Sequence, residues 1–188
     1  MFVSKCRALC LSLALALLPA TASAAQEPPS EKLNFRGVPK DFKLGFKDGN
    51  GMMEFVPEGQ TVHNWKQMIT LNIIPGNRLD LVQARKFISD GWMSACKDGS
   101  VINIRDGQEN GYPFALWQMA CEKNPQTGKP EYTWVKMMQG QEGLYTLQYA
   151  FRYAPDKQEL TRAVSYLRDA LDVCDTRPKE AKKHPCRK

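Results

Sequence analysis

The sequence predicts an α+β domain in which an antiparallel sheet of about six or seven strands carries two amphipathic helices. Two observations lead to this prediction: short segments with apolar residues at every second position, and two longer segments with apolar residues every three or four positions. The composition agrees with it, because 43% of the 188 residues are apolar and 24% are charged, as in an ordinary single globular domain.

Short segments bounded by turn residues provide the expected strands. A hairpin is expected over residues 42–56, because alternating apolar residues flank Asn50-Gly51, the strongest short-range hairpin signal. A third strand is expected over residues 65–74, with its odd-numbered apolar residues facing the core. Further strands are expected at residues 101–105, 112–121, 132–139 and 144–153. The tight glycine-containing turns between them favour an antiparallel meander.

Two segments change to helical periodicity. Apolar residues recur every three or four positions from Leu81 to Lys97, and Asp80 is placed to act as the N-cap. A second apolar stripe begins after Pro155-Asp156 and reaches Cys174, over about five turns. Each helix has one apolar side, so both are expected to pack on the sheet as a single helical layer.

Residues 1–24 have the order of a secretory signal peptide. Lys5 and Arg7 precede an apolar run that ends at Leu18, and a small-residue sequence ending at Ala24 provides the cleavage site. The run is about half of the roughly 20 residues that a membrane span requires. The sequence therefore predicts a periplasmic or secreted protein without a membrane span after cleavage.

The exported chain is expected to contain three further parts. Residues 25–40 start with a stretch rich in proline and polar residues and are expected to form a flexible leader, residues 41–176 a single domain, and residues 177–188 a basic tail. Cleavage leaves 24 basic and 20 acidic residues, a net charge of +4. No aromatic residues are interleaved with the basic tail, so nucleic acid is not an expected partner.

Four cysteines remain after cleavage, an even number in an oxidising compartment, which favours two disulfides over a metal site. Four cysteines allow three pairings. Cys96 ends the first predicted helix and Cys121 ends a strand expected beneath it, whereas Cys174 ends the second helix shortly before Cys186 in the tail. We therefore expect Cys96 to pair with Cys121, and Cys174 with Cys186, which ties the tail back to the domain.

Three segments carry a family resemblance: GQTVHNWKQMIT (residues 59–70), the stretch from Glu109 to Gly140, and LYTLQYAFRYAP (residues 144–155) followed by VCDTR. In these the chain resembles a family of small exported proteobacterial proteins of uncharacterised function. The order of elements is similar to that of Mog1/PsbP-like domains. That resemblance implies a fold and no catalytic residue, because one fold serves many unrelated functions.

The motifs of common enzymes are absent. No nucleophile elbow, phosphate loop, dinucleotide fingerprint or zinc-binding string occurs, so neither a cofactor nor a metal is expected. A carboxylate-dependent hydrolase is the alternative, with Glu109 and Glu142 near turns as its acids. The preferred hypothesis is a non-catalytic module that binds another envelope or secreted protein, as an assembly factor or a toxin inhibitor.

Aromatic and methionine side chains supply the candidate contact surface. The strand at 132–139 has large side chains on both faces, and if helices cover only one face, either Trp134 and Met138 or Val135 and Met137 are partly exposed.

The candidate binding site is centred on Trp65, which directly follows the polar loop that ends at Asn64. If the turn at residues 140–143 approaches the same end of the sheet, Gln139, Gln141 and Tyr145 add polar contacts around it. The alternative is that Trp65 belongs to the core.

Overall fold

The computed structural model describes residues 30–76 and 79–186. The predicted signal peptide, residues 1–24, and the start of the predicted leader lie outside these ranges. Nine strands and two helices form within them. The elements are β1 (Glu31–Phe35), β2 (Phe42–Lys47), β3 (Met52–Pro57), β4 (Gln67–Pro75), α1 (Leu81–Ala95), β5 (Ser100–Glu109), β6 (Tyr112–Cys121), β7 (Glu131–Gln139), β8 (Gly143–Phe151), α2 (Lys157–Ala170) and β9 (Leu171–Asp175). None of the described helices is long and apolar enough to cross a membrane.

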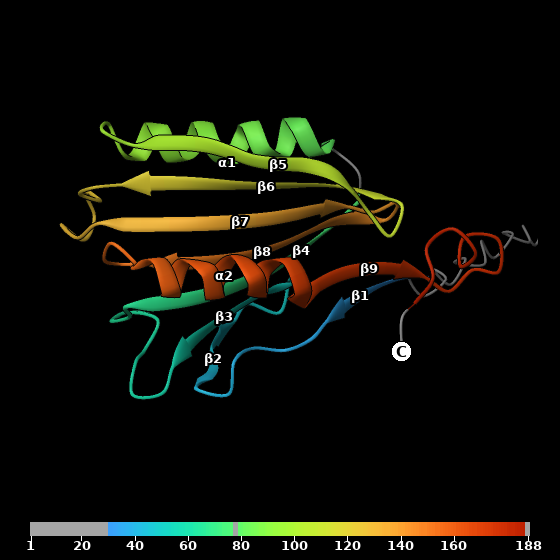
Figure 1. Cartoon of the computed structure of the whole chain (residues 1–188), viewed down its shortest axis with the longest axis horizontal. Coiled ribbons are helices and arrows are strands. Elements are labelled where there is room, and N and C mark those ends of the chain that lie inside the picture. The colour runs from blue at the N-terminus through green and yellow to red at the C-terminus, as the bar shows by residue number, and fades with distance from the viewer. Residues whose placement is uncertain (1–29, 77–78, 187–188) are drawn as a thin grey trace, which may run out of the picture.

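Seven strands form one antiparallel sheet in the order β2-β3-β4-β8-β7-β6-β5 (Figure 1). The predicted meander is therefore only local. After β4 the chain passes through α1 to the far edge of the sheet, and three hairpins bring it back until β8 pairs with β4. The pairing of β4 with β8 joins two segments that are distant in the sequence, so local turn patterns could not predict it.

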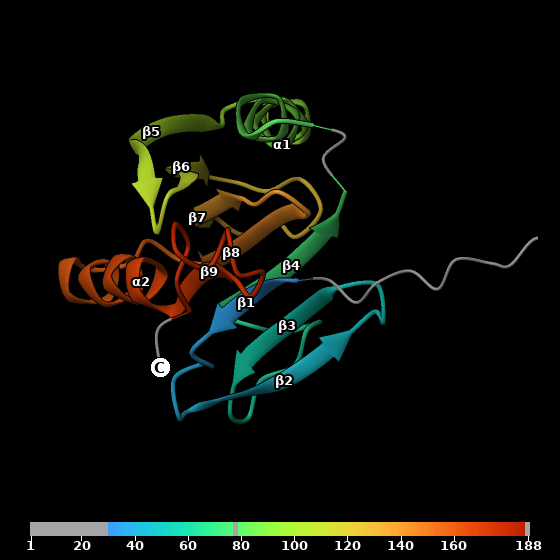
Figure 2. The same cartoon turned by 90° about the vertical axis from the view of Figure 1, so that its right-hand side faces the viewer.

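The two helices lie on opposite faces of the sheet, which corrects the expected single helical layer (Figure 2). Helix α1 packs against the face that carries Val135 and Met137, and α2 packs against the face that carries Trp134 and Met138. All four side chains are buried. The prediction that one of these pairs is partly exposed is wrong, because both faces of β7 are covered.

Helix α2 ends earlier than its apolar stripe suggests. After Ala170 the backbone becomes extended and forms β9, which pairs with β1 in a separate two-stranded sheet. The Nζ of buried Lys136 donates hydrogen bonds of 2.8 Å to the carbonyl oxygens of Arg168 and Leu171. These bonds satisfy carbonyls at the helix end, so no glycine cap is needed there.

Strand β1 lies within the range for which the sequence predicts a flexible leader. Residues 31–35 are ordered because their backbone groups pair with β9 and because Leu33 and Phe35 pack against the main core. Since the partner strand comes from residues 171–175, nothing local in residues 25–40 indicates this strand.

Both predicted disulfides form, Cys96 with Cys121 and Cys174 with Cys186. The predicted N-cap at Asp80 is also correct, since Asp80 forms a capping box with the third residue of α1, and Asp156 does the same at the start of α2. One premise of the pairing argument is wrong: Cys174 lies in β9 and not at the end of α2. The pairing still forms because β9 leads directly into the tail.

Candidate functional site

The five residues predicted to form a binding site lie at two opposite ends of the sheet. In the pairing of β4 with β8, Gln67 is opposite Phe151 at one end, and Pro75 is opposite Gly143 at the other. Trp65 precedes the first of these ends, whereas the turn at residues 140–143 forms the second. The expectation that this turn approaches Trp65 is therefore wrong.

Trp65 itself is largely a core residue. Only 5% of its surface is exposed, and it clusters with Val56, Met68 and Ala150. The guanidinium carbon of Arg152 lies 3.9 Å from the centre of its ring. At this distance the face of the indole stabilises the cation, so Trp65 holds the Arg152 guanidinium in place through a cation–π contact.

A groove of about 490 Å³ surrounds this pair, and we call it the Trp65 groove. Its lining comes from the loop before β4 and the first residue of β4, the turn before β7, the residues after β8 and helix α2: Gln60, Asn64, Trp65, Lys66, Gln67, Lys129, Arg152, Tyr153 and Glu159. Three of these residues are cationic and one is anionic, so the groove has a net charge of three minus one, or +2.

The hydrogen-bonding capacity of the groove is only partly used within the protein. The Tyr153 hydroxyl donates to Glu159 at 2.6 Å, and it accepts from the Gln67 amide at 2.7 Å. By contrast, the buried Nε of Arg152 has no hydrogen-bond partner among the described residues. The donors left for a ligand therefore belong to Arg152 and to the exposed side chains of Lys66 and Lys129.

Burial dominates the protonation behaviour around the groove. It raises the pKa of Tyr153 to about 12, so this hydroxyl keeps its proton and donates to Glu159. Burial also raises the pKa of the neighbouring Glu131, and the positive charge of Arg152 only partly opposes this effect.

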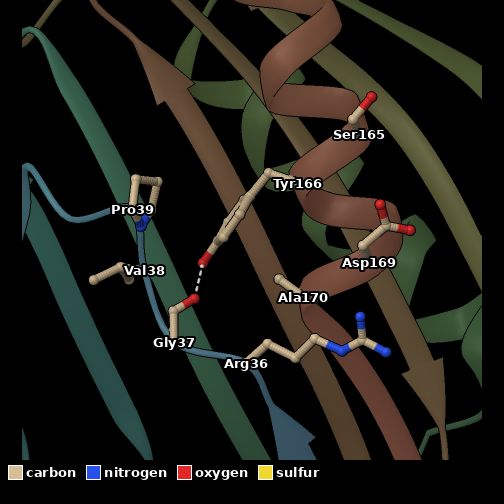
Figure 3. A pocket seen from close by; sticks show the side chains of 8 residues that line it. All are labelled: Arg36, Gly37, Val38, Pro39, Ser165, Tyr166, Asp169 and Ala170. Carbon is tan, nitrogen blue, oxygen red and sulfur yellow. Dashed lines mark hydrogen bonds between the residues drawn. The ribbon is translucent and has the colours of Figure 1, made fainter.

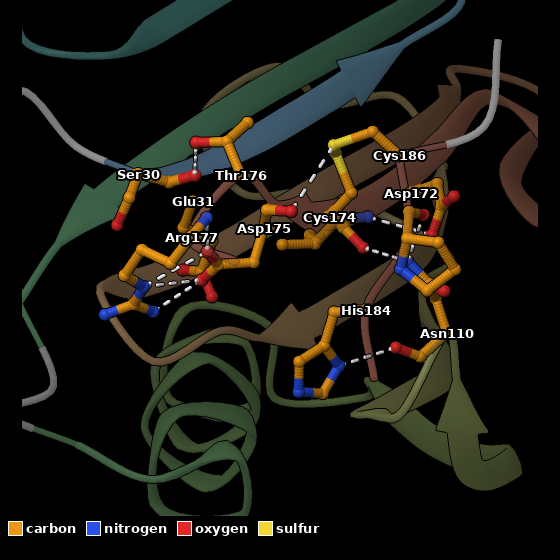
Figure 4. Close-up of a disulfide and its surroundings, with 12 residues drawn as sticks. Ser30, Glu31, Asn110, Asp172, Cys174, Asp175, Thr176, Arg177, His184 and Cys186 are labelled. Atoms are coloured by element: carbon orange, nitrogen blue, oxygen red, sulfur yellow. Dashed lines mark hydrogen bonds and ion pairs between the residues drawn. A yellow bond between two sulfur atoms is a disulfide. The ribbon is translucent and has the colours of Figure 1, made fainter. Parts of the chain in front are cut away.

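At the opposite end, buried and half-buried acids form what we call the carboxylate cluster, which consists of Glu31, Glu142 and Asp175; Figure 4 shows Glu31 and Asp175. Glu31 is 4% exposed and accepts hydrogen bonds from the backbone amides of Gln141 and Glu142 at 2.7 and 3.0 Å. The Tyr145 hydroxyl donates to it at 3.0 Å. Burial and then the nearby charge of Glu31 raise the pKa of Tyr145, so its hydroxyl stays protonated as the donor.

The cluster also holds the C-terminal segment. Arg177 binds Asp175 through Nε and Nη2, and this contact holds the pKa of Asp175 below its usual value. The disulfide between Cys174 and Cys186 lies beside it (Figure 4), and the ring of buried His184 stacks on Tyr112 with centroids 4.0 Å apart. The tail therefore packs on the domain, as the predicted disulfide implies.

The remaining predicted site residues have structural partners. The Gln139 side-chain oxygen accepts a 2.9 Å hydrogen bond from the backbone amide of Leu81 at the start of α1. Gln141 bonds to Glu180 at 3.2 Å and to Arg177 at 2.8 Å. Together with Tyr145, these residues connect parts of the fold, whereas Asn64 and Trp65 line the groove.

Neither proposed catalytic carboxylate has the environment of a proton donor. Glu109 forms a 2.7 Å ion pair with Lys136. The hydroxyl of Ser30 donates to Glu142 and lowers its pKa, which favours the ionised form. No cluster of three or more histidine, cysteine or acidic side chains suited to a metal exists within residues 30–76 and 79–186.

An open pocket of about 360 Å³ lies between α2 and the segment after β1 (Figure 3). The Tyr166 hydroxyl crosses it and donates a 3.0 Å hydrogen bond to the carbonyl oxygen of Gly37. This contact fixes the segment that leads to β2, so we assign the pocket a structural role.

Sequence reasoning missed the cations of the groove. Arg152 follows β8, and its position on the Trp65 side is set by the pairing of β8 with β4. One signal existed in the sequence: continuing the alternation of residues 144–150 by one step places Arg152 on the same face as Ala150. Lys129 had no local signal, because its place depends on the turn between β6 and β7.

The comparisons with known proteins identify a fold and no family. No protein-family model matches the sequence, and no curated protein does. LpqN of Mycobacterium tuberculosis, described as involved in cell envelope biogenesis, has a similar structure, with a TM-score of 0.50 and 15% identity over 78% of this chain and 86% of LpqN.

Two further solved structures are similar over most of the chain. Cyanobacterial PsbP (CyanoP) from Synechocystis matches with a TM-score of 0.48 and 9% identity over 81% of this chain and 98% of its own. The Ran-binding protein Mog1p of Saccharomyces cerevisiae matches with a TM-score of 0.44 and 11% identity over 68% and 75%. The predicted α+β fold, similar to Mog1/PsbP-like domains, is confirmed, and these similarities concern the fold alone.

Proposed function

We propose that the protein is an exported, non-catalytic binding module that holds an acidic segment of an envelope or secreted protein in the Trp65 groove. The observation that carries the proposal is the Arg152 guanidinium, which is stacked on Trp65 and has no ion pair with any of the described residues. Stacking fixes the plane of the guanidinium, which can then bind a carboxylate through two parallel hydrogen bonds.

Charge and composition favour an acidic protein segment as the ligand. The groove carries a net charge of +2, and its lining combines tryptophan, tyrosine and arginine with asparagine and glutamine. These aromatic residues and arginine are enriched where protein interfaces concentrate their binding energy. A role as an assembly factor or as a toxin inhibitor would use such a contact.

Export is part of the same proposal. It rests on the signal-like order of residues 1–24 and on the two disulfides, which persist in oxidising compartments. We place the protein in the periplasm or outside the cell.

The non-catalytic assignment rests on the environments of Glu109 and Glu142, which are held by Lys136 and Ser30. We expect the purified wild-type protein and its variants Glu109→Gln and Glu142→Gln all to show hydrolytic activity at the background level. A glycosidase or esterase activity that either change abolishes would support the hydrolase alternative.

Binding of a fluorescein-labelled hexaglutamate peptide, measured by fluorescence anisotropy, tests the groove directly. We expect Arg152→Gln to weaken binding about tenfold or more, because a charge-assisted bidentate contact is lost. The double change Lys66→Gln and Lys129→Gln should weaken binding less and make it less sensitive to salt.

Lys97→Gln is the matched control, because Lys97 is an exposed lysine in the turn after α1, outside the groove. Equal affinity of wild type, Arg152→Gln and Lys97→Gln would contradict the proposal. A natural partner is then sought with a photo-crosslinker at exposed Asn64. A protein captured this way counts only if Arg152→Gln prevents its capture.

A further inference from the structure

A third hollow, of about 500 Å³, lies between α2 and the β5–β6 hairpin, and we call it the Lys136 cavity. Its volume is within the range of small-molecule sites. Apolar and charged side chains line it together: Ile104, Arg105, Gln108, Glu109, Phe114, Leu116, Lys136, Val164 and Arg168. It lies on the α2 face of the sheet, apart from the Trp65 groove, and shares no lining residue with it.

Lys136 is not available to a ligand in this cavity. Its side chain is 2% exposed, and Nζ forms a 2.7 Å ion pair with Glu109. It also donates to the carbonyl oxygens of Arg168 and Leu171 at 2.8 Å each. A lysine ammonium has three hydrogens, so its donor capacity is used completely by the protein.

The charges around the cavity leave one cation without an ionic partner. Lys136 and Glu109 neutralise each other, and Arg168 forms a 2.7 Å ion pair with Asp169. Arg105 has no ion pair with any residue in the described part of the chain. Its guanidinium carbon lies 5.9 Å from the centre of the Phe114 ring, so its charge is held over an apolar wall.

Apolar side chains form the rest of the wall. Phe114 and Leu116 are each 9% exposed, and Ile104 beside them is 44% exposed on the edge strand β5. Val164 of α2 faces them across the cavity. An exposed isoleucine that continues an apolar wall is favourable when a ligand covers it, because apolar surface is then removed from water.

We propose that the Lys136 cavity binds a small amphiphile with one carboxylate and an apolar body. The carboxylate pairs with Arg105, and the body lies against Phe114, Leu116 and Val164. The orientation follows from the available donors, because the Lys136 ammonium deeper in the cavity is fully used by the protein and only Arg105 is left to pair with a carboxylate. One negative charge matches the one unpaired cation.

Isothermal titration calorimetry with decanoate tests the proposal, with 1-decanol and decyltrimethylammonium as ligands of equal chain length. We expect decanoate to bind about tenfold or more tightly than decanol, since a charge-assisted hydrogen bond is lost in the alcohol. Decyltrimethylammonium should not bind measurably. Equal affinities for decanoate and decanol, or no binding of decanoate, would overturn the proposal.

Two variants locate the binding. Arg105→Gln should weaken decanoate about tenfold and leave decanol unchanged, because Arg105 is exposed and has no structural ion pair. Val164→Trp should fill the cavity and abolish binding of both. If Val164→Trp fails to fold, Arg105→Gln still decides, since unchanged decanoate affinity refutes the assigned orientation.

The outcomes are separable from those of the Trp65 groove. Lys97→Gln should leave decanoate binding unchanged, and Arg105→Gln should leave hexaglutamate binding unchanged. If a peptide with a C-terminal leucine bound much more tightly than decanoate and competed with it, the cavity would recognise peptide ends and not small amphiphiles. That result would also overturn the proposal.

Discussion

The two ends of the sheet contain similar residue types but use them differently. In the carboxylate cluster, Glu31 receives three hydrogen bonds and Asp175 is held by Arg177. In the Trp65 groove, Arg152 is stacked on an aromatic ring and keeps an unpaired donor. A charged group whose bonds are all made within the protein stabilises the fold, whereas one with unused donors can bind a ligand.

The backbone around Gly140 approaches the Glu31 carboxylate closely, which explains how the acceptors of this carboxylate are satisfied within the protein. Gly140 lies directly against the carboxylate of Glu31, and a Cβ at this position would collide with it. The amides that follow Gly140 can therefore point at the carboxylate. At the groove end Arg152 is not enclosed by one such turn, because side chains from four separate segments line the groove.

Among the substitutions that test this comparison, the largest expected loss of stability is at Glu31. Glu31→Ala leaves two partly buried backbone amides and the buried Tyr145 hydroxyl without an acceptor, at about 1–3 kcal/mol for each group. We expect the free energy of unfolding to fall by at least about 3 kcal/mol in urea titrations. A loss below about 1 kcal/mol would mean that water replaces Glu31 and that the cluster is not closed.

Trp65→Ala should destabilise the protein by about 3–5 kcal/mol, because the residue is 5% exposed and its removal creates a cavity. Circular dichroism during thermal unfolding measures the effect. This outcome would confirm that the floor of the groove is core and that the ligand contacts belong to Arg152. Unchanged stability with lost binding would instead restore Trp65 as a direct ligand contact.

Removing the disulfide near the cluster should cost about 3 kcal/mol by the loop-closure estimate, since it closes a separation of 12 residues. The variant Cys174→Ser with Cys186→Ser is compared with wild type in urea. We expect amide hydrogen exchange to speed up in residues 177–186 and in β1. Faster exchange around Trp65 would show that the two ends are not independent.

Acid should affect the two ends in opposite directions. The pKa of Asp175 lies below its usual value of 3.8, so its stabilisation is complete above that pH and is lost as the pH falls through the lower native value. The pKa of Glu131 near the groove lies above its usual value of 4.5, so stability is lost there as the pH rises through 4.5 toward the native value.

Unfolding titrations between pH 2 and 7 on two variants check these signs. Asp175→Asn should reduce the loss of stability below pH 3.8. Glu131→Gln should be relatively more stable than wild type above pH 4.5. If both substitutions shifted the pH dependence of the free energy of unfolding in the same direction relative to wild type, the comparison of the two ends would be wrong.

The smallest expected effect is that of Arg152→Gln on stability. The stack on Trp65 contributes about 0.5–1 kcal/mol at a partly exposed site, and removing the charge also removes an unpaired buried donor. The melting temperature should therefore change by only a few degrees. A large destabilisation would mean that Arg152 holds the fold, as Glu31 does.

Local sequence patterns predicted most of the secondary structure correctly. The turn at Asn50-Gly51, the cap at Asp80, the helix start at Pro155-Asp156 and the alternation along β8 each depend on residues within a few positions of one another. Their energetics are local, so they can be read without the fold. The disulfide pairing followed from the order of these elements.

The sequence by itself determined these elements, their caps and the two disulfides, whereas the tertiary structure decided which of them meet. The pairings of β4 with β8 and of β1 with β9 join residues far apart in the chain, and they place Tyr145 beside Glu31 and Arg152 over Trp65. These pairings are favoured because they allow both faces of the sheet to be buried at once. That condition depends on the whole chain, so no local sequence pattern indicates it.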